Sequence, residues 1–175
     1  MRKFTLPLTP NDIAGMHAYD QVKLSGKLYV GRDQVHRLLF GMIERNEELP
    51  ISLKGATIYY MGPSPAPKGM VIGACGPTTS ARMDPFAPTL LDRGMSVIIG
   101  KGPRSTAVHD AIVRNKAVYL QAFGGCGALY AEAVKRVTPV AFSELGPEAL
   151  IELEVEDFPV IVAIDSHGGS VFSRP

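Results

Sequence analysis

Short apolar runs alternate with helix-like segments through the middle of this chain, and this alternation limits the possible folds more than any other feature. Three turns share one design, in which an apolar run ends in glycine and polar residues before a helix-like segment begins. They are residues 29–33 (YVGRD), 75–84 (CGPTTSARMD) and 98–105 (IIGKGPRS). Strands that alternate with helices are typical of α/β domains. Because both ends of the chain are rich in β-type residues, we predict a mixed sheet covered by helices.

Local patterns predict where the elements lie. Helices are expected to begin near Asp33 and at Ser105 or Thr106, and a short helix before Gly94 is expected to stop there. One more helix is expected over residues 128–137. The expected strands cover residues 56–62, 70–74, 95–100 and 117–123, with a strand, loop and strand over 3–30 and one or two strands over 149–172.

Composition excludes several classes of protein. The 175 residues fit one domain over 1–175, and the formal net charge of +1 gives no reason to expect nucleic acid or an anionic membrane as partner. The N-terminal stretch lacks the long apolar segment of a signal peptide, and no run approaches the length of a membrane span. We therefore expect a cytoplasmic protein with reduced thiols.

Cysteine and histidine are too sparse to predict a metal site in this chain. Only Cys75 and Cys126 carry thiols, whereas an iron–sulfur cluster usually takes three or four. We expect Cys75 to be a buried thiol at a strand end. The four histidines, His17, His36, His109 and His167, are scattered without ligand spacing and are expected to be surface or structural residues. No metal is assigned to this chain.

The three turns carry the cations Arg32, Arg82 and Lys101. Loops at the carboxyl ends of strands tend to bind ligands in α/β sheets, and three converging cations would suit a substrate with more than one carboxylate. Each cation also has a local interpretation: Arg32 beside Asp33, Arg82 beside Asp84, and Lys101 as a solvated loop residue. A positive charge at a helix N-terminus opposes the helix dipole, which favours an anion contact for Arg32.

Other motifs are less informative. Thr78 and Thr79 follow a Gly-Pro turn and are either turn formers or hydroxyls beside an anion site. Neither the phosphate-binding GxxxxGK[ST] pattern nor GxGxxG is present, and no nucleophile stands beside a base. The residues alone therefore indicate a mixed α/β domain with a surface for an anionic ligand.

The same loops resemble a known family, the C-terminal domain of class I fumarate hydratases and the β subunit of L-tartrate dehydratase. The resemblance rests on GPTTSARMD (76–84) followed by IGKG (99–102), and it covers nearly the whole chain in the family's order. The supporting motifs are GRDQVHR (31–37), GPSPAP (62–67), GGCGALYA (124–131) and the run from Glu144 to Gly168.

The resemblance implies a swivelling β/β/α domain and a 4Fe–4S cluster held by three cysteines of another domain or of a cluster-bearing α subunit. By resemblance, Arg32, Arg82 and Lys101 hold a dicarboxylate, and Thr78 transfers a proton once the partner activates its hydroxyl. One departure is Ala81, where relatives often have glycine before the arginine. The methyl group of Ala81 affects the expected pose of Arg82 but not the resemblance to the family.

The expected function is therefore that of the β subunit of a two-subunit hydro-lyase, active only with its partner, which hydrates fumarate to L-malate in the citric acid cycle. An L-tartrate dehydratase β subunit is the alternative within the same class. A non-catalytic dicarboxylate-binding module is the alternative from a different class, although the chain keeps all four expected site residues.

Overall fold

The computed structural model describes residues 1–172, and its strands and helices alternate through the middle of the chain as predicted. The seven strands are β1 (Arg2–Thr5), β2 (Gln21–Val30), β3 (Thr57–Tyr59), β4 (Val97–Gly100), β5 (Val118–Gln121), β6 (Val134–Ala141) and β7 (Leu150–Ile164). The α-helices are α1 (Pro10–Ala14), α2 (Asp33–Glu44), α3 (Ala87–Asp92), α4 (Thr106–Arg114) and α5 (Gly127–Ala133), and two short 3₁₀ helices are η1 (Ser80–Met83) and η2 (Ser143–Glu148).

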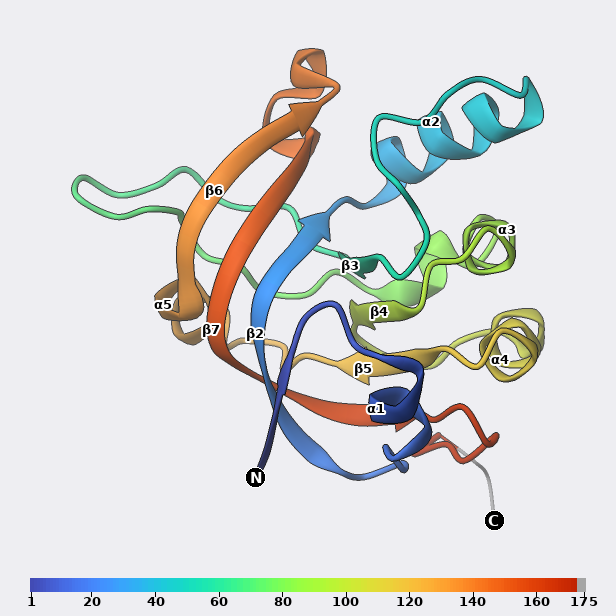
Figure 1. Cartoon of the computed structure of the whole chain (residues 1–175). Coiled ribbons are helices and arrows are strands. Elements are labelled where there is room, and N and C mark those ends of the chain that lie inside the picture. The colour runs from blue at the N-terminus through green and yellow to red at the C-terminus, as the bar shows by residue number, and fades with distance from the viewer. Residues whose placement is uncertain (173–175) are drawn as a thin grey trace.

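The sheet is mixed and closes on itself. Strands β2, β3, β4 and β5 pair side by side in parallel. Strand β7 then pairs antiparallel with both β5 and β2, which completes a ring of five strands. Two edge strands pair with this ring: β1 lies parallel to β2, and β6 lies antiparallel to β7 (Figure 1). The predicted α/β fold with a mixed sheet is therefore confirmed.

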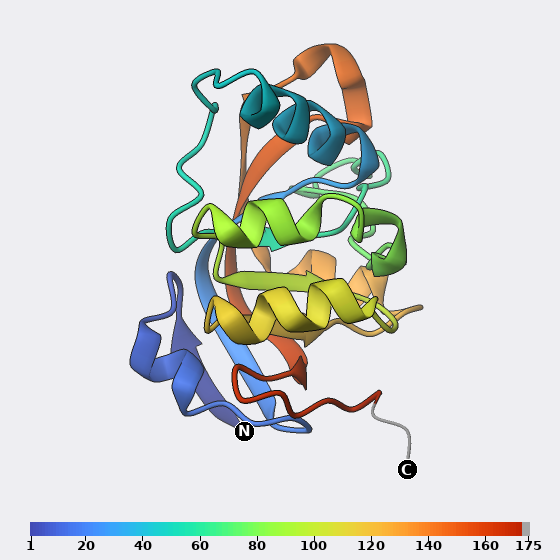
Figure 2. The same ribbon diagram turned by 90° about the vertical axis from the view of Figure 1, so that its right-hand side faces the viewer.

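Two apolar cores lie on opposite faces of this curved sheet. They separate three layers, two made of strands and one made of helices. One core lies within the curved sheet, where side chains of β2, β4, β5 and β7 meet. The other lies between the sheet and helices α2, α3 and α4, which cover one side of the molecule (Figure 2). Val35, Leu39 and Ile43 form the buried face of α2, as their helical spacing predicts. The arrangement is the expected β/β/α order, with helices over the sheet.

Capping residues set the helix boundaries close to those expected. The Ser105 side chain accepts a hydrogen bond from the Val108 amide at 3.3 Å, so α4 begins at Thr106. Helix α3 ends at Asp92, and Gly94 follows with a φ of +107°, a conformation that favours glycine. Within residues 1–172, no helix combines the length and apolar character that crossing a membrane would need.

Two predicted elements are wrong, and the loop expected between the first two strands contains the short helix α1. Residues 70–74 form no strand but belong to a long loop between β3 and η1, which reaches out to the left in Figure 1. The Ala74 amide donates to Ser64 Oγ at 2.8 Å, and the Ser64 amide donates to the Ala74 carbonyl, so the loop's two stems are joined. Cys75 is buried as predicted but follows this loop rather than a strand.

The second error concerns residues 134–137. We predict helix there, but α5 ends at Ala133 and β6 begins at Val134. Antiparallel pairing with β7 decides the outcome, because Val134 and Val137 lie opposite Val155 and Leu153 in the ladder. Pro139 is tolerated because β6 is an edge strand.

Candidate anion-binding site

The candidate site lies where the parallel strands β2, β3 and β4 end. Arg32 follows β2, Thr78 lies in the segment after β3, and Lys101 follows β4 directly. Since the carboxyl ends of parallel strands meet at one edge of a sheet, three of the expected site residues start from neighbouring positions.

Backbone pairing holds Thr78 beside the ends of β3 and β4. Pro77 pairs with Met61, and the Thr78 amide donates to the Tyr60 carbonyl at 2.8 Å. Thr79 pairs with Lys101, and the Lys101 amide donates to Ser80 Oγ at 2.9 Å. Residues 77–80 therefore run between the two strand ends, with Thr78 bonded to the residue after β3 and its neighbour Thr79 paired with Lys101.

Arg32 is held by a residue distant in sequence. Its Nε donates to Glu148 Oε1 at 2.7 Å, and both side chains are 29% exposed. Its guanidinium lies directly against Gly62, where an added Cβ would be 2.4 Å from Cζ. Arg32 thus packs on the residue after Met61, close to the segment that carries Thr78. The local interpretation, a pair with Asp33, is wrong.

Arg82 pairs with Asp33, the residue next to Arg32. Its Nε donates to Asp33 Oδ2 at 3.0 Å, which joins η1 to the first turn of α2. The local interpretation, a pair with Asp84, is also wrong. Asp84 instead accepts hydrogen bonds from Arg104 Nε at 2.7 Å and from the Ser105 amide at 2.8 Å.

Contacts with neighbouring segments therefore hold each of the four expected residues at the same end of the sheet. Arg82 is 52% exposed, and Thr78 and Lys101 are half-buried. The Lys101 side chain runs over Gly124, where an added Cβ would lie 3.8 Å from Nζ. Two of the three cations at this end of the sheet, Arg32 and Arg82, are each paired with one carboxylate.

Sequence reasoning missed three residues that shape this region: Gly62, Arg104 and Glu148. The Arg104 side chain is fully buried between the rings of Tyr60 and Tyr119, with Cζ 5.2 Å and 4.9 Å from their centroids. No local signal distinguishes Arg104 from the exposed cations, because its aromatic neighbours come from β3 and β5. Glu148 lies in the run from Glu144 to Gly168 that supports the resemblance. Its partner Arg32 is 116 positions away in sequence, so no local pattern connects the two.

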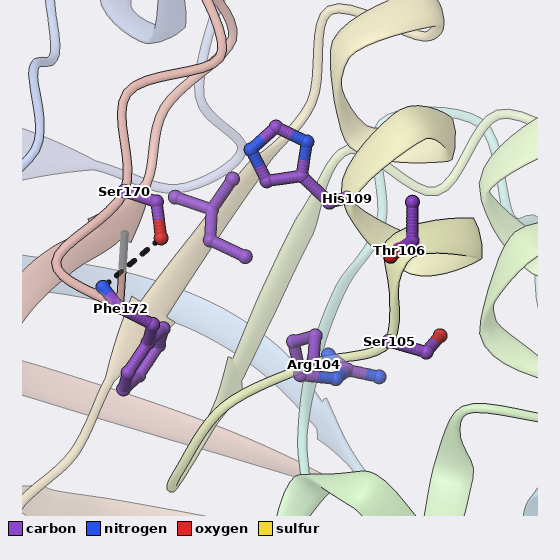
Figure 3. A pocket seen from close by; sticks show the side chains of 7 residues that line it. Arg104, Ser105, Thr106, His109, Ser170 and Phe172 are labelled. Atoms are coloured by element: carbon purple, nitrogen blue, oxygen red, sulfur yellow. Dashed lines mark hydrogen bonds between the residues drawn. The ribbon is translucent and has the colours of Figure 1, made fainter. Parts of the chain in front are cut away.

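A separate hollow of about 290 Å³ lies beside the start of α4 (Figure 3). Its lining residues are Arg104, Ser105, Thr106, His109, Ile164, Ser170 and Phe172. None of the four expected site residues lines it. The hollow is therefore distinct from the candidate site.

The thiols and imidazoles do not fit an iron–sulfur cluster. The Cys75 thiol donates to the Gly73 carbonyl, and burial raises its pKa to about 11, which disfavours the thiolate that iron requires. His36, His109 and His167 each contact a backbone carbonyl oxygen through a ring nitrogen. Across residues 1–172 there is no group of three or more His, Cys, Asp or Glu side chains suited to a metal ion.

The fold and the site define an α/β domain in which the expected site residues lie where the parallel strands end. Residues 2–175 match the family model described as the fumarase C-terminus, and the chain belongs to this family.

Curated relatives of two kinds are similar to this chain. "Fumarate hydratase 2" of Leishmania major and "Fumarate hydratase class I, anaerobic" of Escherichia coli are each 40% identical over 156 residues, which cover 88% of this chain. The chain spans only 28% of the length of each. The "Putative L(+)-tartrate dehydratase subunit beta" of Methanocaldococcus jannaschii is 42% identical over 173 residues, which cover 95% of this chain and 89% of that protein.

Proposed function

We propose that this chain is the β subunit of a two-subunit hydro-lyase that reversibly hydrates fumarate to L-malate. The observation that carries the proposal is that contacts with neighbouring segments hold Arg32, Thr78, Arg82 and Lys101 at the same end of the sheet. Membership of a family whose relatives are named as fumarate hydratases and as a tartrate dehydratase subunit supports the same reaction class.

In this proposal the cations bind and the hydroxyl moves a proton. Arg32, Arg82 and Lys101 neutralise the substrate carboxylates and stabilise the negative charge that develops when a proton leaves carbon. Thr78 Oγ takes or returns that proton. A threonine hydroxyl is far too weak an acid and base to do this unaided, so a group from the partner must activate it.

The partner we propose is a cluster-bearing α subunit that carries a 4Fe–4S cluster, and the active site lies between the two chains. We assign the cluster to the partner because the two thiols here are too few to hold a cluster of that kind. We propose that residues 1–175 act as one domain equivalent to the C-terminal domain of class I fumarases, in the cytoplasm and in the citric acid cycle.

The second candidate is L-tartrate dehydration, which one observation favours. The tartrate dehydratase subunit is matched over 89% of its length, whereas the fumarate hydratases extend far beyond the matched region. A non-catalytic dicarboxylate-binding module would share the anion-binding edge but would turn over none of these substrates.

The test is an anaerobic assay of the chain alone and mixed with its reconstituted cluster-bearing partner, using fumarate, L-malate and L-tartrate. We expect turnover only in the mixture and a fall of at least about 100-fold in Thr78→Ala. Thr79→Ala is the matched control, because Thr79 is the exposed neighbour of the half-buried Thr78. Turnover of tartrate alone would assign the second candidate, and binding without turnover would favour the module.

A further inference from the structure

The Arg32–Glu148 contact joins two residues that are 116 positions apart in sequence. Arg32 stands immediately before α2, and Glu148 ends η2, just before β7. Strands β2 and β7 pair beside them, with Val30 opposite Ile151. The sheet register therefore sets the separation of Arg32 and Glu148.

Glu148 occupies only one edge of the guanidinium. The hydrogen bond uses Arg32 Nε, and neither Nη1 nor Nη2 makes a hydrogen bond to any residue within 1–172. Those two nitrogens form the edge that can bind a carboxylate with two parallel hydrogen bonds. The Glu148 contact therefore leaves the ligand-binding edge of Arg32 open.

Gly62 fixes the orientation from a second direction. An added Cβ at Gly62 would lie 2.4 Å from Arg32 Cζ, 2.7 Å from Nη2 and 2.8 Å from Nε. These similar distances mean that the flat face of the guanidinium lies on the Gly62 backbone. One edge and one face are thus fixed, which restricts both the position and the tilt of the group.

The contact is better suited to orientation than to stability. An ion pair whose two side chains keep about a third of their exposure contributes little to the free energy of unfolding, because water screens the charges. An arginine side chain without such a contact would sample many rotamers and lose that freedom on binding a ligand.

We propose that Glu148 is a positioning residue that holds Arg32 against Gly62 with its Nη edge open to the substrate carboxylate. This inference deepens the proposed function and rests on it. Glu148 itself touches no reacting atom.

The contact can be tested in the chain alone by NMR of the arginine Nε–H groups in ¹⁵N-labelled protein. The Arg32 signal is identified by its loss in Arg32→Lys. We expect it to exchange slowly with water in the wild type and to exchange rapidly in Glu148→Ala. Glu144→Ala, which removes an exposed carboxylate from the same 3₁₀ segment, should leave it unchanged. A persistent slow signal in Glu148→Ala would overturn the proposal whether or not the protein is a hydro-lyase.

The effect of Glu148 on substrate binding is tested by steady-state kinetics of this chain in complex with its cluster-bearing partner. Loss of this contact in Glu148→Ala should raise KM at least about tenfold and lower kcat by a smaller factor, because Arg32 also stabilises the charge that develops in the reaction. Glu148→Gln keeps an acceptor and should recover part of the affinity. A lower KM in Glu148→Ala would mean that Glu148 competes with substrate for Arg32, which would also overturn the proposal. Lack of turnover in the wild type would refute the proposed function. The NMR result would still show whether Glu148 holds the Arg32 guanidinium in place.

Discussion

Two kinds of arginine–carboxylate pair stand within a few residues of each other in this domain. Arg104 pairs with Asp84 in a site where its side chain is 0% exposed. Arg32 and Arg82 pair with Glu148 and Asp33 while remaining 29% and 52% exposed. The bond lengths are alike, so the difference lies in the surroundings.

The surroundings decide what each arginine can do. Arg104 lies between two aromatic rings, and its Nη2 donates to Tyr60 Oη at 3.3 Å. Removing such a buried charge leaves its carboxylate unpaired, so the pair holds the fold together. Arg32 and Arg82 keep access to water and therefore to a ligand. Burial of the cation, and not its pairing, distinguishes Arg104 from the two arginines that we propose bind substrate.

The largest expected effect is that of Arg104→Ala on stability. We expect the free energy of unfolding to fall by about 3–5 kcal/mol, because the Asp84 carboxylate, only 15% exposed, would lose its charged partner. Arg82→Ala is the contrasting variant, and its effect should stay within about 1 kcal/mol. Urea denaturation of both variants measures the difference. A greater loss of stability in Arg82→Ala than in Arg104→Ala would contradict the distinction between buried and exposed pairs.

The next largest expected effect is on the pH dependence of stability, through a histidine buried beside Tyr60. His36 packs edge-on against Tyr60, and burial lowers its pKa from 6.5 to about 4. The folded state thus disfavours the protonated ring, so the stability present above pH 6.5 is lost as the pH falls toward 4. Between pH 7 and pH 5 the wild type should lose about 2 kcal/mol more than His36→Phe, which cannot ionise. Equal losses in urea titrations at the two pH values would contradict this.

The smallest effect concerns Tyr119, whose hydroxyl donates to the Gly102 carbonyl at 2.8 Å and lies 2.9 Å from Ser80 Oγ. Tyr119→Phe should cost about 1–2 kcal/mol, since it leaves buried polar atoms without a partner. It should also speed hydrogen exchange at the Lys101 amide, because Ser80 accepts that hydrogen bond. Tyr19→Phe, at a residue 70% exposed, is the control and should change neither quantity. Unchanged exchange at Lys101 would show that the buried cluster and the site are independent.

The sequence alone could predict the alternation of elements, the caps of α3 and α4, and two cations at strand ends, Arg32 and Lys101. These features depend on neighbouring residues, such as Ser105 before α4 or Gly94 after α3. The roles assigned to Thr78, Arg32, Arg82 and Lys101 came from resemblance and stay predictions.

The partners of these residues could not be predicted, because they are set by packing between distant segments. Adjacency suggested Arg32 with Asp33 and Arg82 with Asp84, but the sheet register brings Glu148 to Arg32, and Asp33 faces Arg82. The apolar run at 70–74 failed for a related reason. Ile72 is buried, but the stems of that loop bond to each other and not to a neighbouring strand.

Strand β7 has a consequence for the order in which this molecule folds. It pairs with β2, β5 and β6, and its ladder with β2 joins residues such as Val22 and Val160. Contacts that close such long loops form slowly, since chain entropy is lost before they contribute stability. The local helices can form early, but the ring of strands is incomplete until β7 docks. The contact between Arg32 and Glu148 depends on that docking, so a partly folded chain would have its helices and still lack this contact.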